Sequence, residues 1–207
     1  MARFDASQLR ALSDKITGND LIINRAASLA INKTLTYSKD LSVEFITKLV
    51  NLQPNYVKRN LRTAKRSSAK DLLGIIRANT RDTLLTRYPF QATNEGVRVA
   101  VNKKEGYKTI KRAFRVTNLR NSGASGIALR NSDAIEVFRS ALSPSTPAKS
   151  RKLQKIIRRA RIKPRGITVL SSRSINQLFL DTREDVKPRS LRFMTKEFLT
   201  DVTRLQR

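Results

Sequence analysis

A large excess of positive charge constrains this chain more than any other feature of its sequence. Its 207 residues include 43 Lys and Arg against 16 Asp and Glu, which gives a formal net charge of +27. Like charges repel one another when a chain becomes compact, and a dense polyanion relieves that repulsion because Lys and Arg replace its condensed counterions. We therefore expect a nucleic-acid partner. A surface that only aids solubility and a surface that binds anionic membrane are the alternatives.

The residue types that the chain lacks exclude several kinds of chemistry. It contains no Cys, no His and no Trp, and aromatic residues make up only 6% of it. Disulfides, thiolate metal sites, imidazole bases and His-dependent triads are therefore impossible within this chain. Proteins that bind single strands by base stacking usually expose more rings than this. We expect a protein that is not an enzyme, needs no cofactor or metal, and contacts the phosphate backbone.

Membrane insertion is not expected. The sequence has no run of about 18 or more apolar residues, the length that a membrane-spanning helix requires. Residues 1–5 also lack the apolar stretch of a signal peptide, so we expect none at this end.

The periodicity of the apolar residues predicts an α+β fold. Helical spacing predicts a short helix over 5–16 and a longer helix from about 20, which either continues to about 51 or is followed by a new helix from 38–40. Further helices are expected over 174–186 and from Pro188 onwards. In the first of them the residues expected to face inward are Ile175, Leu178, Phe179 and Thr182. The expected apolar face of the last helix consists of Leu191, Met194, Phe198, Val202 and Leu205. Short apolar or alternating runs predict a small, mostly antiparallel sheet. Its expected strands cover 72–78, 97–102, 107–116, 126–130 and 167–170.

Composition divides the chain into four regions. Their boundaries fall where the period changes from helical to extended and where Ser143–Ala148 has the composition of a linker. The regions are an N-terminal helical region with a basic stripe (1–66), a small β-rich region (67–142), a basic linker with an amphipathic helix (143–166) and a C-terminal helical region (167–207).

Two segments concentrate the positive charge. The first follows Pro54 in a predicted helix, and we call it the N-terminal basic stripe: Lys58, Arg59, Arg62, Lys65 and Arg66. The second lies within 149–173, a window without any acidic residue, and we call it the central basic segment: Arg151, Lys152, Lys155, Arg158, Arg159, Arg161, Lys163 and Arg165. We expect both to neutralise phosphates, which positions a nucleic acid without reading its sequence. Solvated helix surfaces are the alternative, and for the central segment a membrane-surface helix is another.

Few carboxylates could serve catalysis. Asp181 and Asp185 are four residues apart and would share one face of a helix. Nearby Arg183, Lys187 and Arg189 favour local ion pairs over an acid–base or metal site, with a phosphoryl-transfer enzyme as the alternative.

Residues 174–188 carry the most specific motif. The run Ser174-Ile-Asn-Gln-Leu-Phe179 is followed by Arg183-Glu-Asp-Val-Lys-Pro188. This run resembles the S-[IV]-x-Q-[VLI]-F and [RE]-E-D-[IV]-x-P segments of the minor tail protein Z, or tail completion, family of long-tailed bacteriophages. Weaker similarity lies in the small-residue helix at 23–27 or 30–33, the basic helix at 58–66 and the stretch from Ala113-Phe114 to Gly126 and Arg130. The chain departs from the family in the basic insertion at about 131–165.

The resemblance implies a structural virion protein at the head-proximal end of the tail, made in the host cytoplasm. Its implied partners are the DNA end, bound through its backbone, and tail tube, tail terminator or neck proteins. Several copies would assemble in a ring. A ribosomal-type, RNA-binding structural protein is the alternative that charge and size equally allow.

Overall fold

The computed structural model describes residues 2–4, 20–119, 123–141, 154–155, 157–158, 161–163 and 165–206. It confirms the predicted α+β class. The expected helix over 5–16 and the linker at 143–148 lie outside the described residues. The chain forms two compact units: unit 1 comprises Met1–Lys48, Gln53–Arg81 and Ser174–Arg207, and unit 2 comprises Leu49–Leu52 and Asp82–Arg173. Each unit draws on more than one of the four sequence regions.

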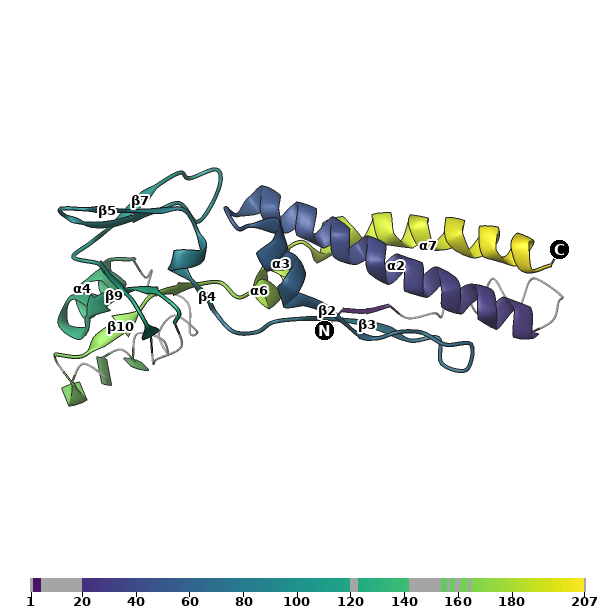
Figure 1. Cartoon of the computed structure of the whole chain (residues 1–207), viewed down its shortest axis with the longest axis horizontal. Helices are drawn as coiled ribbons and strands as arrows, with labels where there is room; N and C mark the ends of the chain where they lie inside the picture. Colours follow the sequence, from purple (N-terminus) through teal and green to yellow (C-terminus); the bar gives the residue numbers. More distant parts are fainter. Residues whose placement is uncertain are drawn as a thin grey trace. The chain divides into compact units, whose positions relative to one another are not determined.

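Unit 1 combines two long helices with a three-stranded sheet (Figure 1). The sheet is antiparallel, with the strand order β1-β3-β2. The elements of unit 1 are β1 (Ala2–Phe4), α2 (Asp20–Leu49), α3 (Pro54–Asn60), β2 (Leu61–Lys65), β3 (Gly74–Ala78), α6 (Ile175–Asp181) and α7 (Arg183–Leu205).

Helix α2 is continuous, which answers the question that the sequence left open. No Gly or Pro interrupts Asp20–Leu49. Two buried hydroxyls satisfy themselves on the helix backbone: Thr34 donates to the carbonyl of Ala30 at 2.7 Å, and Ser42 donates to that of Ser38 at 2.6 Å. Small hydroxyl side chains can therefore line the packed face without leaving a polar atom unpaired.

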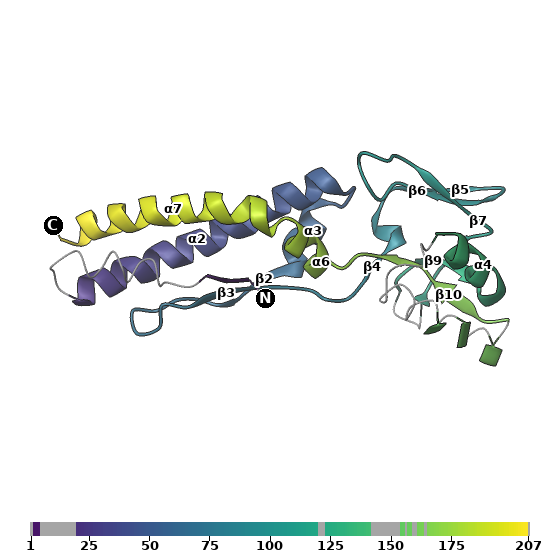
Figure 2. The ribbon, with the colours of Figure 1, turned by 180° about the vertical axis from the view of Figure 1, so that it is seen from behind.

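Helices α2 and α7 run side by side in opposite directions (Figures 1 and 2). The rings of Tyr37 and Phe193 stack with centroids 4.3 Å apart, and Ser38 donates to Ser190 at 2.8 Å. On α7 the predicted apolar face is confirmed where Met194, Phe198 and Val202 are buried. Burial of this shared face is the main favourable term holding the pair together.

The prediction that Pro188 begins the last helix is wrong. Helix α7 begins at Arg183 and contains Pro188. A proline there removes one intrahelical bond. The apolar stripe nevertheless runs across it, from buried Val186 through Ser190 to Met194. Packing against the rest of unit 1 therefore outweighs the local preference.

No helix among the described residues combines the length and the apolar character needed to cross a bilayer.

An ionic cluster joins α2 to α7. Lys33 donates to Glu197 at 2.8 Å and to Asp201 at 2.9 Å, and Arg204 lies 3.2 Å from Asp201. Asp201 is 1% exposed, so its charge depends on these cations. The hydrogen bonds to Glu197 and then Asp201 raise the pKa of Lys33 above its ordinary 10.5.

Lys33 should therefore stabilise unit 1 in a pH-dependent way. A pKa that is raised on folding gives stability that is complete below the unfolded pKa of 10.5 and is lost as pH rises through the folded value. We expect the difference in unfolding free energy between the wild type and Lys33→Gln to be constant between about pH 6 and about pH 9, where the carboxylates are charged, and to shrink towards about pH 12. Urea titrations followed by circular dichroism measure it. A difference that did not change with pH would contradict this role.

Unit 2 contains small antiparallel sheets rather than the single sheet expected. Sheet β5-β6-β7, sheet β10-β9-β8 and pair β11-β4 are separate, while β3 belongs to unit 1. The elements of unit 2 are β4 (Thr83–Leu84), η1 (Leu85–Arg87), β5 (Phe90–Thr93), β6 (Gly96–Val99), β7 (Lys108–Lys111), β8 (Phe114–Val116), β9 (Gly126–Arg130), α4 (Asn131–Ala141), β10 (Ile167–Val169) and β11 (Ser171–Ser172).

The strand expected over 107–116 is in fact two strands. Arg112 adopts a φ of 60°, and its N–H donates to the carbonyl of Glu95 at 2.8 Å. This turn ends β7, and β8 then pairs with β9 in a different sheet. Positive φ is uncommon for a residue other than Gly, so the sequence contains no signal for the turn.

Candidate nucleic-acid interface

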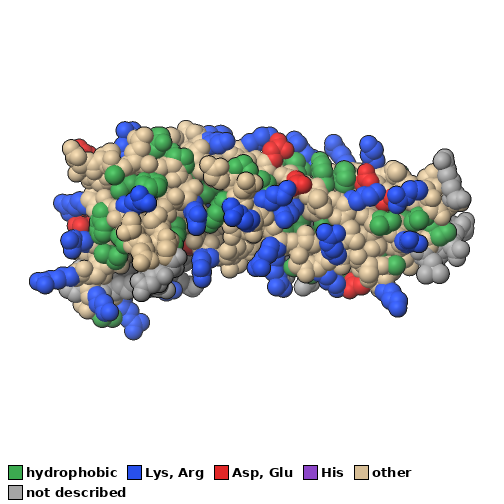
Figure 3. Space-filling view, in the orientation of Figure 1, with side chains coloured by type: hydrophobic (Ala, Val, Ile, Leu, Met, Phe, Trp, Pro, Cys, Tyr) green, Lys and Arg blue, Asp and Glu red, His purple; other side chains and the backbone are tan. Residues whose placement is uncertain are grey.

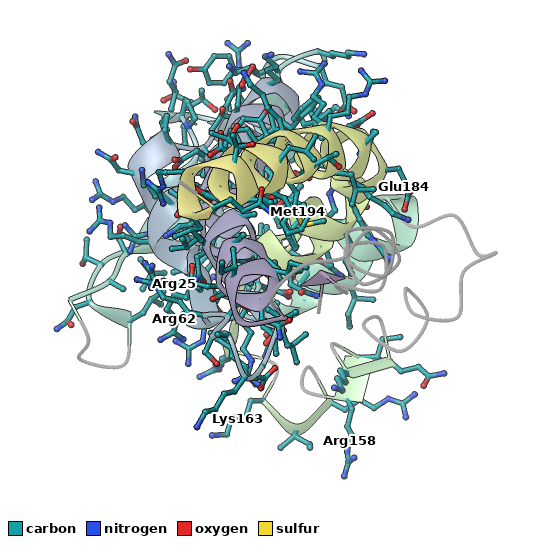
Figure 4. The ribbon with its side chains drawn as sticks, turned by 90° about the vertical axis from the view of Figure 1, so that its right-hand side faces the viewer. Arg25, Arg62, Arg158, Lys163, Glu184 and Met194 are labelled. Carbon is teal, nitrogen blue, oxygen red and sulfur yellow. The ribbon has the colours of Figure 1, made fainter. Side chains whose placement is uncertain are left out.

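The central basic segment presents several cations to solvent. The structure is helical at 154–155, 157–158 and 161–162. Arg158 and Lys163 point outward (Figure 4). The described and exposed cations of this segment are Lys155, Arg158, Arg161, Lys163 and Arg165. Arg151, Lys152 and Arg159 lie outside the described residues. Within the described ranges, no ion pair joins these five side chains to a carboxylate.

A buried asparagine anchors the C-terminal end of the central basic segment. Asn131, which is 3% exposed, donates from Nδ2 to the carbonyl of Lys163 at 2.7 Å and from its backbone N–H to that of Gly166 at 2.9 Å. Its Oδ1 accepts from Thr168 at 2.7 Å. Gly166 is required here, because a Cβ would lie 2.8 Å from the Asn131 amide. The carbonyls of Lys163 and Gly166 and the side chain of Thr168 are therefore held against the start of α4.

Replacing Asn131 with Leu should loosen this anchor. The substitution leaves the Thr168 hydroxyl and the Lys163 carbonyl without their partner, a cost of about 1–3 kcal/mol. We expect faster hydrogen exchange at the amide of Gly166 and a lower urea midpoint. Ser132→Ala, an exposed neighbour, is the control and should change neither. Equal exchange rates in Asn131→Leu and the wild type would show that the anchor does not order this segment.

The N-terminal basic stripe is not one helix, and that prediction is wrong. Helix α3 ends at Asn60, and Leu61 is extended with φ −108° and ψ 113°. Lys58 and Arg59 lie on α3, Arg62 and Lys65 lie on β2, and Arg66 follows it. The cause is the ladder with β3, in which Leu61 pairs with Ala78 and Thr63 pairs with Ile76.

Acidic neighbours engage part of the stripe. Lys58 pairs with Asp40 at 3.0 Å, and Lys65 pairs with Asp71. Both pairs are largely exposed and contribute little to stability, so another anion could compete for these cations. In the part of the chain that the structure describes, Arg62 and Arg66 have no carboxylate partner.

Sequence reasoning missed Arg77. It lies on β3 directly opposite Arg62 on β2, and both side chains are exposed. Residues directly opposite in an antiparallel pair share one face of the sheet. In the sequence, Arg77 is a single Arg near the end of an apolar run. Only the register of β2 and β3 shows that it lies opposite Arg62.

The overall charge cannot be neutralised within the chain. Even if each of the 16 carboxylates paired with one cation, 27 cations would lack a partner. On the face shown in Figure 3, Lys and Arg side chains are spread widely and carboxylates are sparse. Among the described residues, no group of three or more His, Cys, Asp or Glu side chains could hold a metal ion. What this surface offers chemically is the binding of anions.

The motif at 174–188 has a clear local role. Ser174 and Gln177 form a capping box: Ser174 Oγ accepts from the Gln177 N–H at 3.2 Å, and Gln177 Oε1 accepts from the Ser174 N–H at 3.0 Å. The two residues therefore satisfy each other's free N–H groups at the start of α6. The apolar residues of α6 that were predicted to face inward are buried: Ile175, Leu178 and Phe179. Thr182 is buried as well. Asp181 ends α6 and Asp185 belongs to α7.

Comparisons of the chain with protein-family models, with curated proteins and with solved structures found no match.

Proposed function

We propose that the chain is a structural protein that holds duplex DNA through its phosphate backbone and catalyses no reaction. The observation that carries this proposal is the central basic segment, whose described cations are exposed, have no carboxylate partner among the described residues, and end at the Asn131 anchor. Cations held in this way release counterions from a duplex on binding. Such contacts position a duplex without specifying its sequence.

We further propose a place at the head-proximal end of a phage tail, where the leading end of the genome is held. The resemblance at 174–188 supports this placement. Exposed apolar side chains on the helices of unit 1, such as Leu180 at 44% and Leu199 at 47%, are suited to contacts with tail tube, tail terminator or neck proteins. A ring of copies would surround the DNA with cations.

Salt dependence tests the binding proposal. The whole chain is titrated into labelled duplexes of about 30 base pairs and unrelated sequence, at several salt concentrations. We expect affinities that are similar for all sequences and a log–log slope of roughly −0.9 for each phosphate neutralised. A slope near zero would contradict the proposal. Tighter binding to folded RNA would favour the ribosomal-type alternative, and stronger binding to anionic liposomes would favour the membrane alternative.

The placement in the tail needs a separate test. Particles assembled with and without this chain are imaged by electron microscopy. We expect the chain to give density at the top of the tail and the DNA end to shift when the chain is missing. Particles whose tails and DNA ends are identical in both cases would rule out this location.

A further inference from the structure

We infer that unit 1 carries a discrete binding site for one phosphate group, formed by Arg62 and Arg77 on neighbouring strands. The inference depends on the proposed function only for the molecule that carries the phosphate, namely the bound nucleic acid. The site itself depends on the register of β2 and β3, on the hollow beside it and on the side chains that line that hollow.

Arg62 and Arg77 place two like charges at directly opposite positions of neighbouring strands. In the β2–β3 ladder Arg62 is the direct partner of Arg77, and both side chains are exposed on the same face. Like charges directly opposite each other destabilise a sheet. Within the described part of the chain neither guanidinium forms an ion pair that would relieve the repulsion. An anion bound between them would do so.

A hollow lies beside this pair. It is open to solvent, has a volume of about 410 Å³ and has no acidic residue in its lining. The residues that line it are Arg62, Ile76, Arg77, Ala78, Asn79, Thr80, Asn176 and Phe179. Two further lining residues, Thr80 and Asn176, carry a hydroxyl and an amide that can donate hydrogen bonds. The side chain of Arg62, on β2, is labelled in Figure 4.

Hydrogen bonds hold one side of the hollow in place. Asn79 donates from its N–H to the Asn60 carbonyl at 3.0 Å and from Nδ2 to Asn60 Oδ1 at 2.9 Å. Its carbonyl accepts from the N–H of Asn176 at 3.0 Å, which ties the end of β3 to α6. Two other lining residues, Ile76 and Phe179, are buried. The donors therefore project from a backbone that is already ordered, which lowers the entropic cost of binding.

The donor set indicates a phosphate. Each guanidinium is a planar fork that can bind two oxygens of one anion, and two forks with a hydroxyl and an amide match three or four oxygens. A carboxylate has only two oxygens and would leave donors unused. A strand end with a terminal phosphate presents three non-bridging oxygens, whereas an internal phosphodiester presents two together with two weaker ester oxygens, so the two sources require separate measurements.

The first experiment uses inorganic phosphate as the probe. It is titrated into the isotope-labelled whole chain while NMR follows the amides of Thr80 and Asn176 and the Nε–H of both arginines. We expect saturable shifts at these positions and about tenfold weaker binding in Arg77→Gln, because charge-assisted hydrogen bonds are lost. Arg77→Lys keeps the charge but loses the fork, so it should fall in between.

Arg192→Gln is the matched control. Arg192 is exposed on α7, and its replacement removes the same charge from the same unit. It should leave the phosphate shifts unchanged. Equal weakening by Arg77→Gln and Arg192→Gln, or shifts spread over exposed cations in general, would overturn the site. Because Arg77 is exposed and faces a like charge, Arg77→Gln should fold normally, as circular dichroism can verify.

The second experiment uses duplexes with and without a 5′-phosphate. If the site holds a strand end, the advantage of the phosphorylated duplex disappears in Arg77→Gln; if it holds an internal phosphodiester, both duplexes weaken alike. Unchanged binding of both duplexes in Arg77→Gln, together with its loss of the phosphate response, would overturn the assignment of the bound phosphate to the nucleic acid; the phosphate site and the proposed function would both stand. Intact phosphate binding in a chain that binds no duplex would instead remove the proposed function and leave the site.

Discussion

Neutralising the central basic segment should flatten the salt dependence of duplex binding. The variant replaces with Gln the five described cations of the segment: Lys155, Arg158, Arg161, Lys163 and Arg165. Each phosphate contact that is lost should make the log–log slope shallower by roughly 0.9. Over the tenfold range from about 1 M to about 0.1 M salt, the affinity of the variant therefore falls behind that of the wild type by about 0.9 log units for each lost contact. Loss of only two contacts would therefore weaken binding on the order of 60-fold at the lower salt. Fluorescence anisotropy over a range of salt concentrations measures both quantities.

A second variant with the same change in net charge separates local contact from overall attraction. It replaces with Gln five exposed cations outside both basic segments: Arg25, Lys104, Lys187, Arg192 and Lys196. The long-range attraction between protein and duplex depends on net charge, so both variants lose the same amount of it. Only the first variant should also lose direct contacts with phosphates. All ten side chains are exposed, and we expect both variants to keep the wild-type circular dichroism spectrum. Equal slopes in the two variants would mean that the central segment is not the contact site.

Phe198→Ala should cause the largest loss of stability. Phe198 is 0% exposed and lies on the face that α7 buries in unit 1. Truncating a buried Phe to Ala costs about 3–5 kcal/mol, through lost transfer energy and the cavity that remains. A typical domain is stable by only about 5–15 kcal/mol, so much of the stability of unit 1 would disappear. Urea unfolding followed at 222 nm, with hydrogen exchange of α2 amides to report on unit 1, measures the effect.

Leu199→Ala is the control on the same helix. Leu199 is 47% exposed, and its truncation should cost less than about 1 kcal/mol. Similar losses in the two variants would show that the buried face of α7 has been wrongly assigned. The large loss should leave the central basic segment unaffected at temperatures where unit 1 remains folded, since that segment belongs to unit 2. Duplex binding measured well below the melting transition checks this expectation.

Local patterns accounted for much of the fold. The helical stripe that begins near residue 20 predicted α2, and Ile175, Leu178 and Phe179 face inward as expected. The strand over 126–130 was also predicted with its bounds. These elements depend on interactions within a few residues, such as the capping box of Ser174 and Gln177, so their signals can be read along the chain.

Two predictions from the sequence were wrong because the pairing of strands decided the outcome. The stretch after Asn60 has a plausible helical pattern, but the ladder with β3 makes it a strand. The stretch 107–116 looks like one strand, but Arg112 turns the chain into another sheet. Both outcomes depend on partners that lie farther along the chain, and no local window contains that information.

For the candidate interface, the sequence by itself determined the net charge of +27, the absence of Cys and His and the two segments where cations cluster. Only the tertiary structure decided that Asp40 and Asp71 engage Lys58 and Lys65, and that Asn131 holds the end of the central segment. It also placed Arg77 opposite Arg62. The physical reason is that charge is a sum over residues, whereas a partner is a position in space, which the register of two strands and the packing of helices define.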